Sequence, residues 1–417
     1  MNNSAQAPHV TVIGGGIAGI VTALTLRRDG HDVTVIDEMD ARKRCSFGNG
    51  GAIGPDSCTP MAMPGMLAKI PKWLFDKGGP ISVDWRYLPR TLPWLLRWVG
   101  ASGMERARAS SVAMRAMHGP SLEIYRDLLG AERYGDLVRA TGNLYVYESA
   151  EPSKPELIGR KLQREQGVQP ETLTADDVRN LEPALAPIFK RGVMLPRNVF
   201  TVNPSRFLST LTEQFLATGG TLVEGRVIGF DMTPSGPRAV RTEAGPLSVD
   251  KIVVSAGAWS GQLTAQLGTR VPLEAERGYH VTLPDAGVEL HNKVMNGTHS
   301  FGLTPMEDGL QITGTVEIAS VNAAPNPQRA DALLDHGRRM LPGLRDIGAS
   351  TWMGCRPSLP DSLPVVGRSP QFTNVFFAFG HSHWGLSGAP MTGQIITAMI
   401  SGREPPIDTH PYRVERF

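Results

Sequence analysis

The chain has 417 residues, and its 42 Lys and Arg nearly balance its 40 Asp and Glu, which leaves a formal net charge of +2. This balance excludes a protein that binds nucleic acid mainly through its charge. Hydrophobic residues make up 41% and charged residues 20%, so the chain can bury a large core and is not disordered throughout. The length suits two or three domains, or two that are interleaved.

The three cysteines indicate a reducing compartment. Cys45, Cys58 and Cys355 are too few for a disulfide framework, and their spacing matches no metal site. Residues 1–8 lack the basic start and the apolar stretch of a signal peptide. No run of 18 apolar residues predicts a membrane-spanning helix. We therefore expect a cytoplasmic protein that holds no metal.

The N-terminal segment has the pattern strand, glycine loop, helix, strand. His9–Ile13 is a short β-branched run that predicts a buried parallel strand. Ile20–Arg28 has a helical pattern, and Asp32–Ile36 predicts a second strand. Between the first strand and the helix lies the sequence GGGIAG, a G-x-G-x-x-G motif. A glycine motif in this setting is typical of dinucleotide binding.

Each glycine of this motif has a physical role. Gly14 permits the tight turn, Gly16 lets the backbone approach a pyrophosphate, and Gly19 lets helix and strand pack closely. The helix N-terminus offers free N–H groups to the phosphates. An acidic residue after the second strand accepts hydrogen bonds from the ribose, and we prefer Asp37 to Glu38 because it follows the strand directly.

The motif alone does not distinguish NAD from FAD, but two later segments do. Cys45–Pro55 is rich in glycine where an NAD domain would continue with a helix and a strand, so the chain is expected to pass close beneath an extended ligand. A second strand at Asn374–Phe379 leads into a glycine loop at 380–388 and a helix at Met391–Ile400. The N-terminus of this helix would stabilise negative charge on a flavin ring.

Together these segments resemble the FAD-dependent D-amino-acid oxidase superfamily, and in particular the bacterial D-amino-acid dehydrogenases. The resemblance covers nearly the whole chain and includes RGYHVTLP at 277–284, GCRPSLPDSLPVVGRSP at 354–370 and GHSHWGLSGAP at 380–390. It implies an α/β fold in which an antiparallel-sheet substrate domain is inserted into a discontinuous, Rossmann-like FAD-binding domain. We assign residues 1–60, 185–270 and 350–417 to the FAD-binding domain, and 61–184 and 271–349 to the substrate domain.

The resemblance implies FAD that is not covalently attached. Some members of the superfamily bind FAD through a cysteine in this region, but counting back from Pro360 and Asp361 places that position at Gly354 and not at Cys355. The residues expected to bind the cofactor are Gly14, Gly16, Ile17, Ala18, Gly19, Asp37, Glu38, Ser46, Asn49, Gly50, Gly51, Val227, Ala256, Gly257, Trp259, Gly380, Gly385, Leu386 and Ser387.

The activity that the resemblance implies is oxidative deamination of a D-amino acid. A hydride leaves the substrate Cα for flavin N5, and the imino acid hydrolyses to a 2-oxo acid. The electrons pass to a quinone or another acceptor that is not oxygen. Cyclic substrates such as D-proline or hydroxy-D-proline are included. Two alternatives stay open, a glycine- or sarcosine-type oxidase that uses oxygen and a non-catalytic FAD-bearing subunit of an electron-transfer complex.

Four side chains are candidates for the substrate site. Arg356 matches the family's carboxylate-binding arginine, whose planar fork suits a carboxylate. Tyr279 would bind the same carboxylate or simply pack as a strand aromatic. His381 matches the family's Gly-His pair, whereas His383 and Trp384 stand where the dehydrogenases carry small residues. Trp384 would narrow the pocket, and His383 contacts the substrate or is an ordinary loop residue.

Residues 58–100 form an unusual segment in which tryptophan, proline and basic residues alternate. Four of the seven tryptophans lie within 26 residues, at Trp73, Trp85, Trp94 and Trp98. Lysine and arginine between them outnumber the acids, which is typical of a membrane interface. The segment is therefore a candidate for peripheral contact with the inner membrane, and the alternative is packing on the substrate domain or a subunit.

Overall fold

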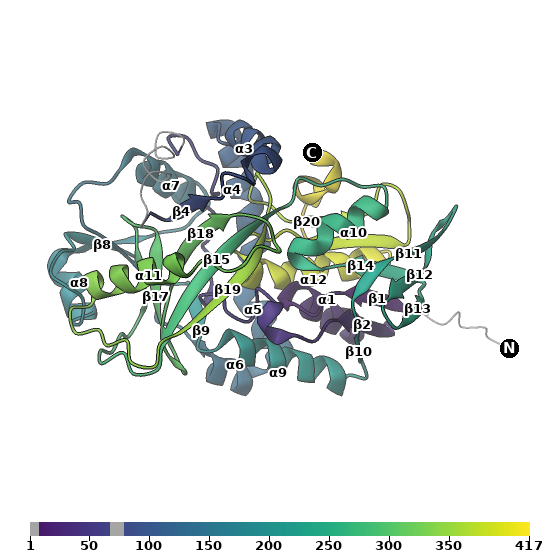
Figure 1. The fold of residues 1–417 in the computed structure, drawn as a ribbon, viewed down its shortest axis with the longest axis horizontal. Helices are drawn as coiled ribbons and strands as arrows, with labels where there is room; N and C mark the ends of the chain where they lie inside the picture. Colours follow the sequence, from purple (N-terminus) through teal and green to yellow (C-terminus); the bar gives the residue numbers. More distant parts are fainter. Residues whose placement is uncertain (1–7, 67–78) are drawn as a thin grey trace.

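A computed structural model describes residues 8–66 and 79–417 of the chain. Within these ranges the strands form a six-stranded sheet, a nine-stranded sheet and two three-stranded sheets. The elements of the six-stranded sheet gather at one end of the molecule, and those of the nine-stranded sheet at the other (Figure 1). The chain crosses between the two several times, as expected for an inserted substrate domain.

The six-stranded sheet is parallel except at one edge. Its order is β10 (Thr221–Glu224), β2 (Val33–Asp37), β1 (Val10–Ile13), β14 (Lys251–Val254), β21 (Val375–Phe379) and β20 (Val365–Arg368). Only β20 runs antiparallel to its neighbour. Both predicted N-terminal strands are confirmed, and their carboxyl ends meet at the same edge of the sheet. That edge is where open α/β sheets bind their ligands.

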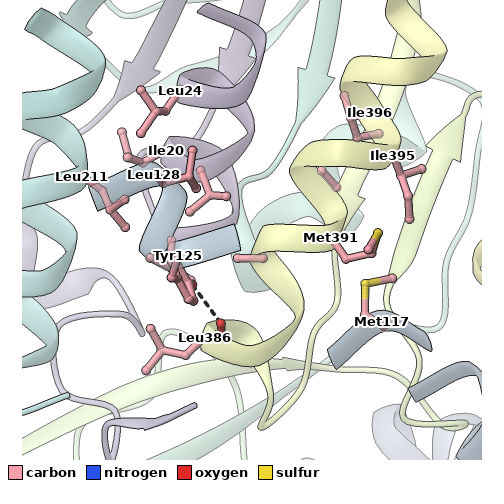
Figure 2. Close-up of a cluster of buried hydrophobic side chains, with 14 of the residues drawn as sticks. Ile20, Leu24, Met117, Tyr125, Leu128, Leu211, Leu386, Met391, Ile395 and Ile396 are labelled. Carbon is pink, nitrogen blue, oxygen red and sulfur yellow. Dashed lines mark hydrogen bonds between the residues drawn. The ribbon is translucent and has the colours of Figure 1, made fainter. Parts of the chain in front are cut away.

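Helices on this sheet share one apolar core. α1 (Ile17–Arg28) packs against α12 (Gly385–Ile400), and α9 (Pro204–Ala217) and α5 (Ser121–Leu129) contribute to the same cluster (Figure 2). α12 begins six residues before the predicted start. Figure 2 shows the Tyr125 hydroxyl donating to the Leu386 carbonyl across 2.8 Å. This bond ties the N-terminus of α12 to α5.

The nine-stranded sheet is mostly antiparallel, as predicted. Its path is β19 (Ser350–Ser358), β15 (Glu274–Leu283), β18 (Gly309–Ile318), β17 (Phe301–Met306), β16 (Lys293–Asn296), β6 (Asn143–Tyr147), β8 (Arg191–Leu195) and β7 (Glu171–Thr174), and β4 (Ile81–Val83) pairs with β18. The pairs β16–β6 and β18–β4 are parallel. α11 (Pro327–Met340) packs on β15 and β18.

Further helices and two small sheets surround the two main sheets. The helices are α3 (Leu88–Ala101), α4 (Met104–His118), α6 (Ala131–Leu137), α7 (Lys154–Glu165), α8 (Ala175–Leu181) and α10 (Ser260–Gln266). The small sheets are β11 (Val227–Thr233), β12 (Gly236–Thr242) and β13 (Gly245–Ser248), and β3 (Ala52–Ile53), β9 (Val199–Thr201) and β5 (Val138–Arg139). No helix in the described ranges is both long and apolar enough to cross a bilayer.

Two details differ from the sequence-based expectation. The sequence over 105–130 predicts one long helix, but the structure has two, α4 and α5, separated at Gly119 and Pro120, where proline lacks the N–H that an unbroken helix needs. The sheet pairing also crosses the proposed domain boundaries. β8 and β19 pair within the nine-stranded sheet, although residues 185–270 and 350–417 were assigned to the FAD-binding domain.

Candidate active site

A cavity of about 930 Å³ is lined by residues from both main sheets. Of the predicted cofactor-binding residues, all but two line it: Gly14, Gly16, Ile17, Ala18, Asp37, Glu38, Ser46, Asn49, Gly50, Val227, Ala256, Gly257, Trp259, Gly380, Gly385, Leu386 and Ser387. Gly19 and Gly51 do not reach it. Gly19 packs so closely on the Gly14 carbonyl that a Cβ there would overlap it. Gly51 lies against Thr201 of β9.

The glycine loop after β1 brings bare backbone to the cavity wall. Gly14 has a φ of +110°, a conformation that favours glycine. A Cβ on Gly16 would meet only the Ser46 hydroxyl oxygen, at 3.5 Å, so this glycine keeps space open toward the cavity. The Ile17 N–H at the start of α1 donates to Ser46 Oγ at 3.0 Å. The loop therefore presents a helix N-terminus and an open cradle that suit a pyrophosphate.

The two acids after β2 differ in their surroundings. The Asp37 carboxylate accepts from the Gly15 N–H at 2.5 Å and the Arg44 guanidinium at 2.6 Å, and its side chain is 13% exposed. The Glu38 side chain is 42% exposed and forms an ion pair with Lys43 at 3.1 Å. Asp37 is thus fixed against the glycine loop, which favours it over Glu38 as the ribose acceptor.

The loop after Cys45 is shaped by its own side chains. The Asn49 amide donates to the Ser46 carbonyl at 2.9 Å, and its oxygen accepts from the Gly51 N–H at 2.8 Å. These two bonds close a tight turn that leaves Gly50 at the cavity.

The second glycine loop brings the N-terminus of α12 to the same cavity. Gly380 has a φ of +87° at the turn after β21. Ser387 Oγ in the first turn of α12 accepts from the Gly54 N–H at 2.9 Å, so it joins the two loops. The free N–H groups of this first turn can therefore stabilise negative charge on a bound ring.

Arg356 of β19 lies where the nine-stranded sheet forms one wall of the cavity. Its guanidinium lies over Gly278 of β15, where any Cβ would overlap it. One nitrogen donates to the Thr315 carbonyl at 3.2 Å. Within residues 8–66 and 79–417 no carboxylate lies within ion-pair distance of this guanidinium. Arg356 can therefore bind an anionic ligand.

His383 lines the cavity near Arg356 and is held by an acid that the sequence analysis did not identify. Its Nε2 bonds with Glu276 Oε2 at 2.8 Å. Glu276 is the cross-strand neighbour of Arg356. Burial raises the Glu276 pKa, but the hydrogen bond to His383 and the nearby Arg356 charge outweigh it, so the net pKa lies below the usual value. The carboxylate is thus ionised and fixes the imidazole orientation.

Tyr279 and His381 border the cavity but have partners elsewhere. The Tyr279 hydroxyl donates to Glu317 at 2.6 Å and accepts from the Asn326 N–H at 2.9 Å, at the start of α11. His381 bonds with the Thr392 hydroxyl at 2.8 Å inside the helical core. Burial lowers the His381 pKa to about 3, so this imidazole is neutral. The structure thus gives both polar groups contacts that stabilise the fold.

Residues 9–399 match the family described as FAD dependent oxidoreductase. The chain belongs to this family. Its open glycine cradle, the Asp37 carboxylate after β2 and its second helix N-terminus fit FAD, which the protein binds as its cofactor.

Two curated relatives match along nearly their whole length. A D-amino-acid oxidase of Bradyrhizobium diazoefficiens is 36% identical over 420 residues, which cover 99% of each chain. A D-amino acid dehydrogenase of Dechloromonas aromatica is 31% identical over 413 residues, covering 95% of this chain and 98% of the relative. Among solved structures, glycine oxidase from Geobacillus kaustophilus superposes with a TM-score of 0.74 at 19% identity, over 98% of this chain and 99% of that one. This last likeness shows the fold.

The sequence analysis missed several residues of this flavoprotein's cavity. Trp352 of β19 stacks on His280 of β15, with ring centroids 5.1 Å apart, and a Cβ on Gly48 would overlap the Trp352 ring. Lys293 of β16 also lines the cavity, buried among neutral groups. Only the alternation of side chains along a known strand register could have placed these residues.

Part of the tryptophan-rich segment lies outside the described residues, including Trp73. Trp94 is buried and its indole N–H donates to the Ser358 carbonyl at 3.2 Å, so this side chain packs on the substrate sheet. Trp98 lines the cavity. Trp85, before α3, is 60% exposed. The segment therefore has both a packed face and an exposed face.

Proposed function

We propose that this flavoprotein catalyses the oxidative deamination of D-amino acids to 2-oxo acids. The observation that carries the proposal is the Arg356 guanidinium, which lies in the flavin cavity over Gly278 and has no carboxylate partner among the described residues. The names of the two curated relatives, a D-amino-acid oxidase and a D-amino acid dehydrogenase, support the choice of substrate.

In this proposal Arg356 binds the substrate's α-carboxylate. Two parallel N–H groups of its fork meet the two carboxylate oxygens, which fixes the position of Cα on the cavity floor. When bound, the flavin accepts a hydride from Cα and leaves an imino acid that water hydrolyses to the 2-oxo acid.

His383 accepts a hydrogen bond or a proton from the substrate amine. Its Nε2 is occupied by Glu276, and its Nδ1 has no hydrogen-bond partner in the described part of the chain. Oxidation at Cα requires a neutral amine, because an ammonium group opposes the loss of hydride. An imidazole whose orientation is fixed by a carboxylate can remove that proton. Glu276 is then a positioning residue.

For the electron acceptor we propose a quinone reached at a membrane surface. An exposed apolar stripe supports this choice: Leu92 is 47% and Leu96 64% exposed on α3, and Trp85 lies just before the helix. The basic residues Arg86, Arg90 and Arg97 flank the stripe and are exposed as well. Figure 1 shows α3 at the outer edge of the molecule, next to α4. Apolar and basic side chains together favour an anionic lipid surface.

We also propose that FAD is bound without a covalent link. Cys355 is buried, and burial raises its pKa to about 11, so the reactive thiolate is scarce at neutral pH. Acid precipitation should release all yellow flavin into the supernatant. Flavin that stays with the precipitated protein would show an attachment.

Anaerobic reduction of the flavin tests the activity. The purified holoenzyme is mixed with single D-amino acids, their L-enantiomers, D-proline, glycine and sarcosine, and absorbance near the flavin maximum is followed. The proposal predicts bleaching by D-amino acids and little bleaching by L-enantiomers. Fast bleaching by glycine or sarcosine alone would favour the oxidase of that type. The rates at which a quinone and oxygen reoxidise the reduced flavin are then compared, and the faster one identifies the acceptor.

A further inference from the structure

Lys293 is a buried cationic side chain on the floor of the flavin cavity. It is 3% exposed and lies on β16. In the sheet, β16 is three strands away from β15, which is the neighbour of the Arg356 strand β19. Its Nζ donates to the Gly50 carbonyl and to Thr304 Oγ1, both at 2.6 Å. Gly50 belongs to the loop that lines the cofactor side of the cavity. Lys293 therefore reaches the cavity where the two sheets meet.

The charge of this lysine is not balanced by the described protein. An ammonium group has three N–H donors, and the two bonds to Gly50 and Thr304 use two of them. In residues 8–66 and 79–417 no carboxylate lies within ion-pair distance of its Nζ. Burial lowers the Lys293 pKa to about 7. A buried cation is costly without a counter-charge, and a nearby anion would hold this amine in its charged form.

Strand β18 connects Lys293 with Arg356. Arg356 donates to the carbonyl of Thr315. A Cβ on Gly50 would lie 3.2 Å from Lys293 Nζ and 3.3 Å from Thr313 Oγ1, so Lys293 and Thr313, two residues before Thr315 on β18, flank the same point beside Gly50. At about 3.3 Å per residue along a strand, the two points on β18 that these cationic groups approach lie roughly 7 Å apart. That separation suits two carboxylates of one small molecule.

We propose that Lys293 binds the side-chain carboxylate of an acidic D-amino acid while Arg356 binds its α-carboxylate. The inference rests on the proposed function, since it requires the α-carboxylate at Arg356. It assigns D-glutamate and D-aspartate to the substrate range. Neutral D-amino acids are also substrates, and with these bound Lys293 is uncharged. The alternative counter-charge for Lys293 is the negative charge on the reduced flavin. The test below distinguishes the flavin from a substrate carboxylate.

The test compares matched acids and amides on the FAD-loaded enzyme. Binding of glutarate and of its monoamide, glutaramate, is measured by the shift they cause in the flavin absorbance spectrum. Anaerobic flavin reduction is then measured with D-glutamate and D-glutamine. The variants are Lys293→Met, which removes the charge, and Lys293→Gln, which keeps a hydrogen-bond donor for Gly50 and Thr304. Lys190→Met removes one exposed charge from the same sheet region and serves as the control.

The proposal predicts that both Lys293 variants weaken glutarate binding and D-glutamate reduction roughly 10- to 100-fold, because a charge-assisted bond is lost in a desolvated site. Glutaramate binding and flavin reduction by D-glutamine should change less than about 3-fold in these variants. Lys190→Met should leave glutarate binding and D-glutamate reduction unchanged. Equal losses for acid and amide, or loss of FAD from both variants, would assign Lys293 to the flavin and overturn the proposal. Wild-type reduction by D-glutamine but not by D-glutamate would overturn it too. Failure of every D-amino acid would instead refute the proposed function.

Discussion

Gly278 of β15 and Arg356 of β19 lie so close across their strand pair that a single methyl group on the glycine would occupy the place of the guanidinium. The missing side chain at Gly278 lets Arg356 lie flat over the sheet and face the cavity. The carboxylate site that we propose thus depends on two positions that are 78 residues apart in the chain.

Gly278→Ala should displace the guanidinium without removing its charge. We expect the affinity for D-amino acids to fall roughly 10- to 100-fold, because a bidentate contact loses its geometry when the fork shifts. FAD content should stay unchanged. Titration of substrate during anaerobic flavin reduction measures the effect. Gly135→Ala in α6, where a Cβ meets nothing within 4 Å, is the control. Unchanged affinity in Gly278→Ala would show that this contact does not position the substrate.

Gly16→Val should produce a folded protein without FAD. The protein itself leaves room for a side chain here, since the nearest atom to a Cβ is Ser46 Oγ at 3.5 Å. The added branches would therefore project into the cavity and block the approach of the pyrophosphate. Circular dichroism should match the wild type while flavin absorbance is lost. Stoichiometric FAD in the folded variant would remove this loop from the binding site.

Two buried histidines should make the protein sensitive to acid. Burial lowers the pKa of His118 to about 4 and that of His381 to about 3, below the ordinary value of 6.5. Between pH 6.5 and 4 the unfolded chain takes up protons that the folded protein refuses, so stability falls as the pH falls. A shift of this size corresponds to about 3 kcal/mol for His118. The melting temperature, measured at a series of pH values from 7 to 4.5, should fall steeply.

His381→Gln tests the origin of that loss. The variant keeps a hydrogen-bonding group for Thr392 but cannot titrate, so its melting temperature should decline less steeply with falling pH. His410→Gln changes an exposed histidine and serves as the control. An unchanged slope in His381→Gln would show that other groups govern the acid sensitivity.

Leu92→Glu with Leu96→Glu tests the proposed membrane contact of α3. We expect wild-type protein to co-sediment with vesicles that contain anionic lipids, and the double variant to lose at least about 10-fold in partitioning, because two apolar contacts are replaced by charges. Leu216→Glu with Ile347→Glu changes two exposed apolar residues elsewhere and is the control. Equal sedimentation of all three proteins would favour a packing or subunit role for the stripe.

The first part of the cofactor side of the cavity could be predicted because its residues are close in sequence. The turn at Gly14, the helix after it and the acid at Asp37 follow from one continuous motif, although the helix begins at Ile17, three residues before the predicted start. The substrate half depends on strand register. Glu276 meets His383, and Lys293 meets Gly50, across separations of more than 100 residues. No local pattern specifies such pairs, since a shift of one residue turns a strand's side chains to the opposite face.

Tyr279 illustrates the same limit. Its position beside Arg277 and His280 in the resembling segment made it a candidate for substrate binding. The folded sheet instead places its hydroxyl on Glu317, which also forms an ion pair with Arg277 at 3.1 Å. The sequence contains these residues but not the pairing of β15 with β18 that brings them together.

The most direct test of the account is anaerobic flavin reduction by Arg356→Ala and Arg356→Lys. With a D-amino acid, truncation should lower the second-order rate constant for reduction roughly 30- to 4000-fold, or about 2–5 kcal/mol, and lysine should restore only part of it. FAD content should remain that of the wild type, and an amine without a carboxylate should react equally with all three proteins. If Arg356→Ala loses its FAD, or slows acid and amine substrates to the same extent, Arg356 does not bind the substrate carboxylate.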